Sequence, residues 1–311
     1  MMHSKQRALL VGAGLPGLRY LPAFQRLDGK WCELAGLVGS AAAAGFPNIP
    51  RFTQLDTALV ALQPNVVIVT APPPASLPLA RQAARSGATV LVEPPVMISL
   101  AGWTPQSHDG RIFVALPSHF APGLAGLIVE PPAIERAEVD LVCHQSATDF
   151  GPWQQFWNHS GGILHQHALA GIALAVRLLP RTAVLKCTGR RWHRRQHSPA
   201  EDAIDAEVLF TDGRRLAINA RTDAPTDLHR RHELRLIRRT KVTKIAGRNL
   251  EAGLAERSTA PSETELRAQM LHAAANTTEG RAEHPSLLGL RDLPKTLEVI
   301  TRVYSDCTVA R

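Results

Sequence analysis

Residues 7–19 read Arg-Ala-Leu-Leu-Val-Gly-Ala-Gly-Leu-Pro-Gly-Leu-Arg, which places an apolar run directly before a glycine-rich turn. A short strand, a Gly-x-Gly-x-x-Gly turn and the start of a helix make the phosphate-binding corner of a dinucleotide-binding fold. Gly12 permits the tight turn, Gly14 lets the backbone approach a pyrophosphate, and Gly17 lets the helix lie close to the strand. An ordinary glycine turn is the alternative, but the position between a strand and a helix favours a dinucleotide site.

Length and composition set the limits of the fold. The chain has 311 residues, 45% of them hydrophobic and 20% charged, as expected for a soluble globular protein with room for two domains. The net charge of +8 is spread over many arginines, which favours a solvated surface that also suits an anionic cofactor. The run Arg190–Arg195 contains Trp192 and is the one stretch typical of nucleic-acid binding. We interpret it as an exposed loop and expect no nucleic-acid partner.

The cysteines and the apolar stretches bear on location. The four cysteines lie far apart and match neither a zinc motif nor a disulfide framework, which predicts a reducing, cytoplasmic setting. The most apolar late stretch, residues 168–179, contains Arg177 and is too short to span a bilayer. We therefore expect no membrane segment.

Strands and helices alternate through the first half of the chain. This alternation predicts a doubly wound parallel sheet, with ligands at the carboxyl ends of the strands. The predicted strands are 32–38, 65–70, 89–92 and 111–116, and the predicted helices are 18–27, 57–62 and 77–86. Val38 closes the second strand and is followed by Gly39-Ser40-Ala41 without an acidic residue, which favours NADP over NAD. The predicted cofactor-binding residues are the three glycines with Leu15, Pro16, Ser40, Pro72, Glu93 and Pro94.

The second half predicts an α+β substrate domain. Residues 133–142 alternate as in a strand, residues 207–210 and 215–219 flank an Asp-Gly hairpin turn, and 232–237 with 242–245 continue an antiparallel sheet. We expect a Rossmann domain over residues 1–118 and a substrate domain over residues 119–311. We expect a final helix over residues 287–304. The sequence leaves open whether it packs within the second domain or back on the first.

Three strings carry a family resemblance. Val-Gly-Ala-Gly-Leu-Pro-Gly at 11–17, Val-Val-Ile-Val-Thr-Ala-Pro at 66–72 and Gly-Ala-Thr-Val-Leu-Val-Glu-Pro-Pro at 87–95 resemble the glucose-fructose oxidoreductase, inositol dehydrogenase and MocA-like family. The stretch Ser160-Gly161-Gly162 resembles the opening of that family's catalytic helix. The resemblance implies a second domain with an open, mainly antiparallel sheet, helices on one face, and use of the sheet to form a homodimer.

The resemblance also locates the proton-transfer residues of sugar-oxidising members. Their lysine, aspartate and histidine fall on Pro94, His165 and Leu169, so none is retained. A gap would place His167 on the family histidine without restoring the other two. Because proline has no ionisable group, this pattern argues against ordinary polyol dehydrogenation.

Several strings resemble the thiazolinyl imine reductase branch of the family, which departs at the same lysine. They include Tyr20-Leu21-Pro22-Ala23-Phe24, Ser118-His119-Phe120-Ala121-Pro122 and residues 222–229. The resemblance implies reduction of a C=N bond in a siderophore or other natural-product intermediate, and the residues after the second strand favour NADPH as the hydride source. The basic run at 190–195 leaves a carrier-protein-bound substrate open. An imine nitrogen is more basic than a carbonyl oxygen, so a histidine suffices as proton donor.

Three histidines are the candidate donors: His165 first, because it replaces a family catalytic position, then His119 and His167. The chain has thirteen histidines, so for each candidate the alternative to a catalytic role is that of a packed or surface residue. No nearby carboxylate or cysteine completes a metal site with His165 and His167. Two other functions stay open: redox chemistry on a small carbonyl or alcohol with an unusual proton donor, and a cofactor-binding partner protein without redox turnover.

Overall fold

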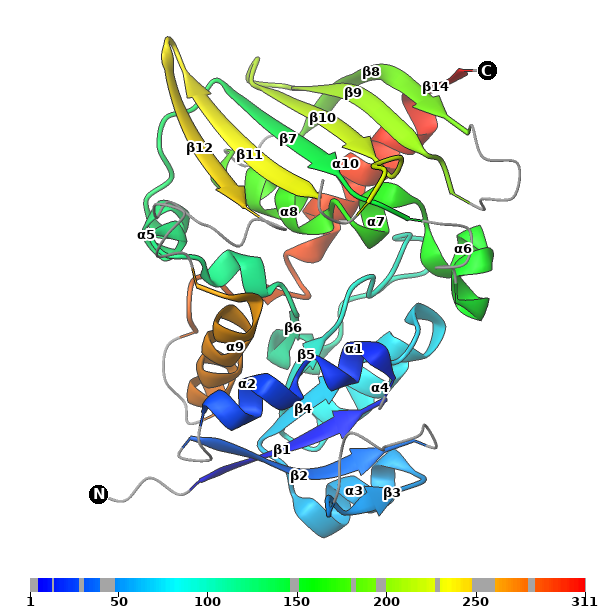
Figure 1. The fold of residues 1–311 in the computed structure, drawn as a ribbon, viewed down its shortest axis with the longest axis vertical. Coiled ribbons are helices and arrows are strands. Elements are labelled where there is room, and N and C mark those ends of the chain that lie inside the picture. The colour runs from blue at the N-terminus through cyan, green and yellow to red at the C-terminus, as the bar shows by residue number, and fades with distance from the viewer. Residues whose placement is uncertain are drawn as a thin grey trace. The chain divides into compact units, whose positions relative to one another are not determined.

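The computed structural model describes residues 5–12, 14–27, 31–39, 48–145, 151–179, 183–193, 200–226, 230–247, 261–278 and 283–310. The chain divides into two compact units (Figure 1). The first consists of Met1–Met97, Thr104–Phe120 and Pro261–Arg291. The second consists of Ile98–Trp103, Ala121–Ala260 and Asp292–Arg311. This division differs from the expected one because the late segment Pro261–Arg291 belongs to the first unit.

The first unit is built on a seven-stranded sheet of order β13-β6-β5-β4-β1-β2-β3. Every pairing is parallel except that of β13 with β6. All residues of strands β4 and β5 are buried, as in central strands covered on both faces. The predicted doubly wound sheet is confirmed. Its strands are β1 (Gln6–Val11), β2 (Cys32–Val38), β3 (Arg51–Phe52), β4 (Val66–Val69), β5 (Thr89–Val92), β6 (Ile112–Val114) and β13 (Leu288–Gly289).

The helices of this unit differ from the sequence prediction at several places, among them the start of α3, which lies at Leu55 instead of residue 57. The single helix expected over 18–27 is two helices, α1 and α2, separated at Arg19 and Tyr20. Pro22 explains the break, because its missing N–H cannot bond back to the carbonyl of Leu18 and so suits the first turn of a new helix. Helix α4 begins at Pro73, four residues before the predicted start. The helices are α1 (Leu15–Leu18), α2 (Leu21–Arg26), α3 (Leu55–Leu62), α4 (Pro73–Arg85) and α9 (Glu263–Thr278), with 3-10 turns at Ser107–Arg111 and Pro117–Phe120.

The second unit holds another seven-stranded sheet, of order β12-β11-β7-β10-β9-β8-β14. It is mainly antiparallel, with parallel pairing only between β7 and β10 and between β8 and β14. Gly213 has a φ of +86° in the hairpin between β9 and β10, so the predicted Asp-Gly turn is confirmed. The strands are β7 (Arg136–Val142), β8 (Val184–Trp192), β9 (Ala203–Phe210), β10 (Arg215–Arg221), β11 (Arg231–Arg238), β12 (Lys241–Gly247) and β14 (Thr308–Ala310).

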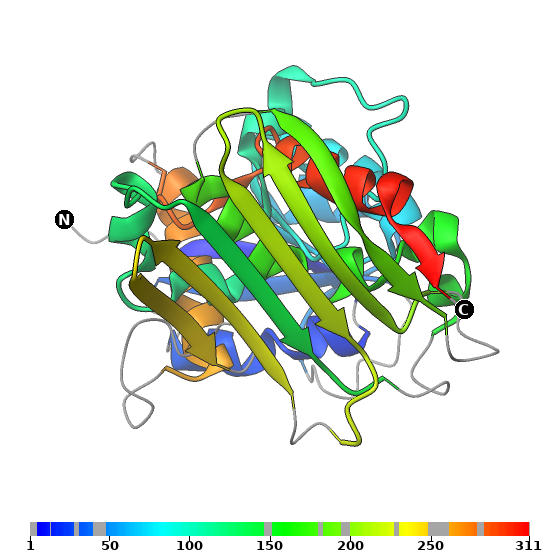
Figure 2. The ribbon, with the colours of Figure 1, turned by 90° about the horizontal axis from the view of Figure 1, so that it is seen from above.

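Helices α8 and α10 cover one face of this sheet (Figure 2). The final helix begins at Leu293 instead of Leu287, and α10 packs on α8, β8 and β9 of its own unit instead of on the first domain. Arg190 to Trp192 form the end of β8, so this part of the basic run is strand and not loop; Arg194 and Arg195 lie outside the described residues. The helices are α5 (Leu124–Val129), α6 (Trp157–Ser160), α7 (Ile163–Gln166), α8 (Leu169–Leu178) and α10 (Leu293–Asp306), with a 3-10 turn at Pro152–Gln155.

None of the helices in the described part of the chain combines the length and the apolar character that a bilayer span requires.

Candidate functional site

The glycine corner of the first unit needs glycine at two positions. Gly12 has a φ of +91°, and a Cβ there would lie 2.7 Å from Oγ1 of Thr70. The same Thr70 hydroxyl donates a 2.5 Å hydrogen bond to the carbonyl of Gly12, which fixes the turn against the end of β4. A Cβ on Gly17 would lie 2.5 Å from the carbonyl oxygen of Gly12. Any side chain at either position would therefore separate α1 from β1.

Gly14 differs, because the protein leaves the space beside it open. Among the residues that the structure describes, a Cβ there would meet only Cδ of Pro16, at 3.8 Å, and the φ of Gly14 is an ordinary −73°. The neighbouring Leu15 is 78% exposed, which is unusual for a large apolar side chain. An open cradle beside an exposed leucine fits a dinucleotide that covers both. Helix α1 is only four residues long, so its dipole is small. The backbone N–H groups of the corner therefore contribute more to binding a phosphate than the helix dipole does.

Three further predicted cofactor residues follow the carboxyl ends of neighbouring parallel strands. Pro72 is exposed where β4 leads into α4, and Glu93 with the half-buried Pro94 follows β5. Strands β1, β4 and β5 are parallel neighbours, so the glycine corner, Pro72 and Glu93 lie at one edge of the sheet. Pro94 is joined to Pro95 by a cis peptide bond. Ser40, the residue predicted to favour NADP, lies outside the described residues.

Glu93 is held by two residues that the sequence analysis did not identify. Tyr20 donates a 2.5 Å hydrogen bond to Oε1 of Glu93, and Nη1 of Arg267 donates a 2.8 Å bond to the same oxygen. Tyr20 is fully buried, and burial, followed by the neighbouring Glu93 charge, raises the pKa of Tyr20 well above its usual value. The phenol therefore stays a donor. Sequence spacing gave no signal, because the partners lie 73 and 174 residues from Glu93.

His119 lies in the 3-10 turn after β6 and is fully buried. Its backbone N–H bonds to the carbonyl of Leu116, which closes the turn. A side chain without exposed surface has no direct access to a substrate, so this geometry favours a packing role for His119.

The Gly161-Gly162 turn of the second unit is explained by what fills the space beside it. Gly161 has a φ of +61°, and a Cβ on it would overlap the ring of His165. A Cβ on Gly162 would overlap both the Glu201 carboxylate and the Tyr304 hydroxyl. The two glycines thus admit the buried side chains of His165 and Glu201 and the partly buried one of Tyr304 at the start of α7.

His165 is 3% exposed, and both of its ring nitrogens have backbone partners. Nδ1 accepts from the N–H of Gly162 at 3.4 Å, which leaves Nε2 to donate to the carbonyl of Ile98 at 3.1 Å. The ring stacks on Tyr304, with centroids 5.4 Å apart and an angle of 3° between the planes. Burial lowers the pKa of His165 to about 4. Because the ring is buried and both of its nitrogens are bonded to backbone groups, the geometry of His165 suits packing better than proton donation.

His167 is the only one of the three predicted donors that keeps partial exposure. Its Nε2 lies 3.3 Å from Oε1 of Gln145, so the amide oxygen accepts from the ring N–H. Burial, with the nearby Arg230 charge, lowers the pKa of His167 to about 4. Gln145 and Arg230 come from segments before and after His167 in the chain, and no sequence motif indicates that they lie near it. Within the described ranges, no three His, Cys, Asp or Glu residues are grouped to hold a metal ion.

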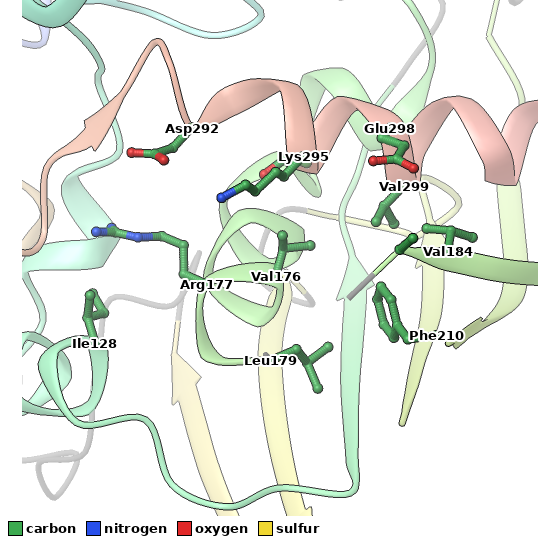
Figure 3. Close-up of a pocket in the computed structure, with 12 residues that line it drawn as sticks. Ile128, Val176, Arg177, Leu179, Val184, Phe210, Asp292, Lys295, Glu298 and Val299 are labelled. Atoms are coloured by element: carbon green, nitrogen blue, oxygen red, sulfur yellow. The ribbon is translucent and has the colours of Figure 1, made fainter. Parts of the chain in front are cut away.

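A separate cavity of about 440 Å³ lies in the second unit between α8 and α10 (Figure 3). Apolar side chains, including Val176, Leu179 and Phe210, line part of this cavity. Its charged lining residues are Arg177, Asp292, Lys295 and Glu298. Burial lowers the pKa of Arg177 below its usual range, against the opposing effect of the Asp292 charge. None of the residues predicted from the sequence lines this cavity.

Residues 6–105 match the model of the GFO_IDH_MocA family, described as "Oxidoreductase family, NAD-binding Rossmann fold". The resemblance stated from the sequence is thereby confirmed for these residues. Residues 6–105, most of which belong to the first unit, are thus similar to the NAD-binding Rossmann fold of an oxidoreductase family. No curated protein matches the chain.

Solved structures share the fold along nearly the whole chain. GenD2 from gentamicin A biosynthesis, in complex with NAD, is 17% identical with a TM-score of 0.75, and the match covers 98% of this chain and 95% of that one. The WlbA dehydrogenase from Bordetella pertussis, in complex with NADH and UDP-GlcNAcA, is 15% identical with a TM-score of 0.77 over 98% and 96% of the two chains. A myo-inositol dehydrogenase from Corynebacterium glutamicum is 13% identical with a TM-score of 0.74 over 97% and 96%. At these identities the likeness is one of fold.

Proposed function

We propose that the protein is an NADPH-dependent reductase of a C=N bond in a natural-product or siderophore intermediate. The observation that carries this proposal is Pro94, which follows Glu93 at the carboxyl end of β5 where the sugar-oxidising relatives have their proton-transfer lysine. A site without that lysine is poorly suited to removing a proton from an alcohol.

Imine reduction places smaller demands on the protein. A hydride adds to the carbon and a proton to the nitrogen, and the nicotinamide cofactor supplies the hydride when it is bound. An imine nitrogen is basic enough to be protonated to a useful extent near neutral pH, whereas a carbonyl oxygen is not. A weak or transient proton donor is therefore sufficient.

His167 is the residue we propose for that proton. Gln145 accepts from Nε2 and orients the ring, so Nδ1 is the nitrogen that takes up and releases a proton. With a pKa near 4, the protonated ring is rare at pH 7 but strongly acidic, and it hands its proton to a more basic nitrogen readily.

NADPH is proposed over NADH because no acidic residue follows β2 in the sequence 38–41. The open cradle at Gly14 and the required glycines at 12 and 17 support dinucleotide binding of either kind. Titration of the intrinsic tryptophan fluorescence with both cofactors separates the two, and tighter binding of NADH would overturn the preference.

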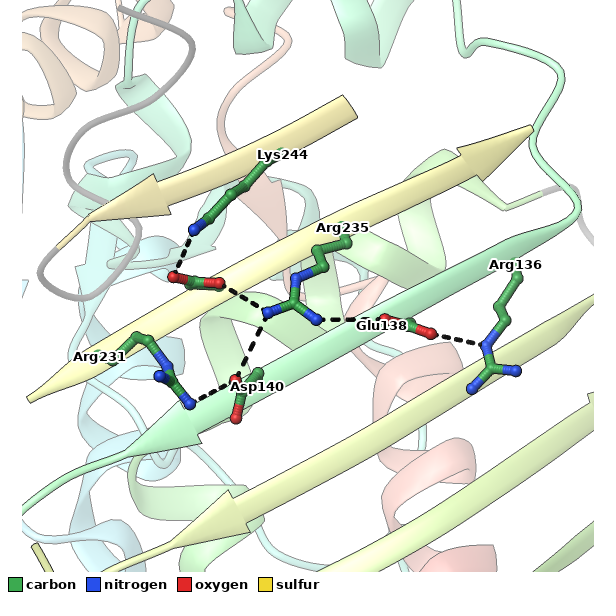
Figure 4. Close-up of polar contacts among 7 residues, drawn as sticks. Arg136, Glu138, Asp140, Arg231, Arg235 and Lys244 are labelled. Atoms are coloured by element: carbon green, nitrogen blue, oxygen red, sulfur yellow. Dashed lines mark hydrogen bonds and ion pairs between the residues drawn. The ribbon is translucent and has the colours of Figure 1, made fainter. Parts of the chain in front are cut away.

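We propose a homodimer formed through the sheet face of the second unit that α8 and α10 leave uncovered. This face carries charges of both signs that pair within the chain, including Arg231 with Asp140 at 2.7 Å and Arg136 with Glu138 at 2.9 Å (Figure 4). Charges of both signs on one face can also pair with the same face of a second copy. Light scattering tests the state directly: a dimer that dissociates when Arg231 is changed to Glu supports the proposal, and a monomeric wild-type protein contradicts it.

The activity is tested by NADPH consumption with cyclic imines, sugars and ketones. Simple alcohols are tested in the reverse direction, by the reduction of NADP+. The proposal predicts turnover with cyclic imines alone, whether free or attached to a carrier protein. Turnover of a sugar or ketone instead would identify the carbonyl or alcohol reaction. Tight cofactor binding without turnover of any substrate would favour the redox-inactive partner protein.

A further inference from the structure

We infer that Arg267 of α9, together with Tyr20, is a positioning residue that holds Glu93 in place for cofactor binding. The inference rests on the proposed function, since it concerns the same nicotinamide dinucleotide. It adds to the cofactor site a helix that begins some 170 residues after Glu93 in the chain, at Glu263.

The contacts of Arg267 form a buried fork. Its side chain is 3% exposed, Nη1 bonds Oε1 of Glu93 at 2.8 Å, and Nη2 bonds Oε1 of Glu263 at 2.6 Å. The guanidinium carbon lies 4.6 Å from the centroid of the Tyr20 ring, so the cation also rests on an aromatic face. A buried arginine with carboxylates on both sides and a ring beneath it has one well-defined geometry.

Tyr20 connects this fork to the glycine corner. It lies two residues after the end of α1, and its N–H bonds to the carbonyl of Gly17, the last glycine of the corner. Its hydroxyl donates to the same Oε1 of Glu93 that accepts from Arg267. The corner, the loop after β5 and α9 are therefore tied together at one oxygen atom.

This arrangement orients the remaining oxygen of Glu93. With Oε1 engaged by two donors, the half-buried carboxylate cannot rotate without breaking both bonds. The position of Oε2 is then fixed as well, and Glu93 follows β5 at the edge of the sheet where the glycine corner also lies. Such an acceptor suits the hydroxyl or amide donors of a nicotinamide nucleotide.

A second ion pair between α2 and α9 provides a matched control. Arg26 pairs with Glu265, two residues from Arg267 on the same helix, but the Arg26 side chain is 57% exposed and has no contact with Glu93. If α9 acted only by packing on the unit, the loss of either pair would affect cofactor binding alike.

The experiment measures the dissociation constants of NADPH and NADH for Arg267→Met, Arg267→Lys and Arg26→Met, with circular dichroism to establish folding. We expect Arg267→Met to weaken binding by about 10- to 100-fold, because it leaves the Glu93 charge without its buried partner. Arg267→Lys keeps that charge but loses the forked geometry, so it recovers only part of the affinity. Arg26→Met stays within about twofold of wild type, because an exposed ion pair contributes little.

Several results would overturn the inference. Unchanged binding by a folded Arg267→Met variant would do so, and so would an equal loss in Arg26→Met. If Arg267→Met does not fold, Tyr20→Phe removes the other donor while keeping the ring; unchanged affinity in that variant contradicts the inference, and a clear loss supports it. A wild-type protein that binds neither cofactor would instead overturn the proposed function, and this inference with it.

Discussion

The hydroxyl of Tyr304 donates a 2.6 Å hydrogen bond to Oε1 of Glu201 in the interior of the second unit. The same oxygen accepts the N–H of Ile163 at 2.8 Å, and the Tyr304 oxygen accepts the N–H of Leu164 at 3.1 Å. The two side chains thus bind the first N–H groups of α7, which have no partners within their own helix. They can approach so closely only because Gly162 has no side chain.

Gly162→Ala is therefore expected to destabilise the protein by about 1–3 kcal/mol, because the added methyl overlaps Glu201 and Tyr304. Urea unfolding measures the change. Gly126→Ala is the control: Gly126 lies in α5 with nothing within 4 Å of the added methyl, and the change is neutral or stabilising by up to about 1 kcal/mol. Equal stability of the two variants would contradict this explanation of the Gly-Gly turn.

The second prediction concerns pH and His165. Burial lowers its pKa from 6.5 to about 4, so the unfolded chain binds more protons than the folded one between these values. The stability that follows is complete above pH 6.5 and is lost as the pH falls toward 4. For this group the free energy of unfolding should drop by about 2 kcal/mol between pH 7 and pH 5.

His165→Gln, which retains a donor and an acceptor, is the comparison for that measurement. Urea unfolding at pH 7 and pH 5 should give a clearly smaller loss in the variant than in wild type. His167 and the other groups titrate in both proteins and cancel in the difference. Identical losses would show that His165 is not a neutral interior histidine.

Much of the first unit could be predicted from the sequence because its signals are local. Strand β2 occupies the predicted residues 32–38, and the buried strands β4 and β5 are apolar except for Thr89. The helix expected over 18–27 was wrong because Pro22 outweighs the apolar pattern around it. Hairpin β9–β10 was equally local, marked by its Asp-Gly turn.

The site residues that the sequence did not predict depend on contacts between distant segments. Nothing near Glu93 indicates Arg267, and nothing near Gly162 indicates Glu201 or Tyr304. The preference for His165 as donor used its position after the Gly-Gly turn, but position alone does not reveal that both ring nitrogens bond to backbone. These relationships arise only when the chain is folded.

The third prediction separates His167 from His165 by kinetics. His167→Ala should lower kcat for imine reduction by about 10²-fold or more while leaving the dissociation constant of NADPH unchanged, as expected for a lost proton donor. His165→Gln should change stability more than kcat. A His167→Ala variant with wild-type kcat would exclude this residue as the donor.

The central claim is that the glycine corner binds a nicotinamide dinucleotide, and Gly14→Ala tests it most directly. In the protein itself the added methyl has room, since only Cδ of Pro16 lies near it, at 3.8 Å. The melting temperature should therefore match that of wild type, whereas the dissociation constant of NADPH should rise by about tenfold or more, because the methyl occupies space the pyrophosphate needs. Fluorescence titration of the two proteins gives the answer. Equal affinities, or no binding of either cofactor by the wild-type protein, would contradict the account.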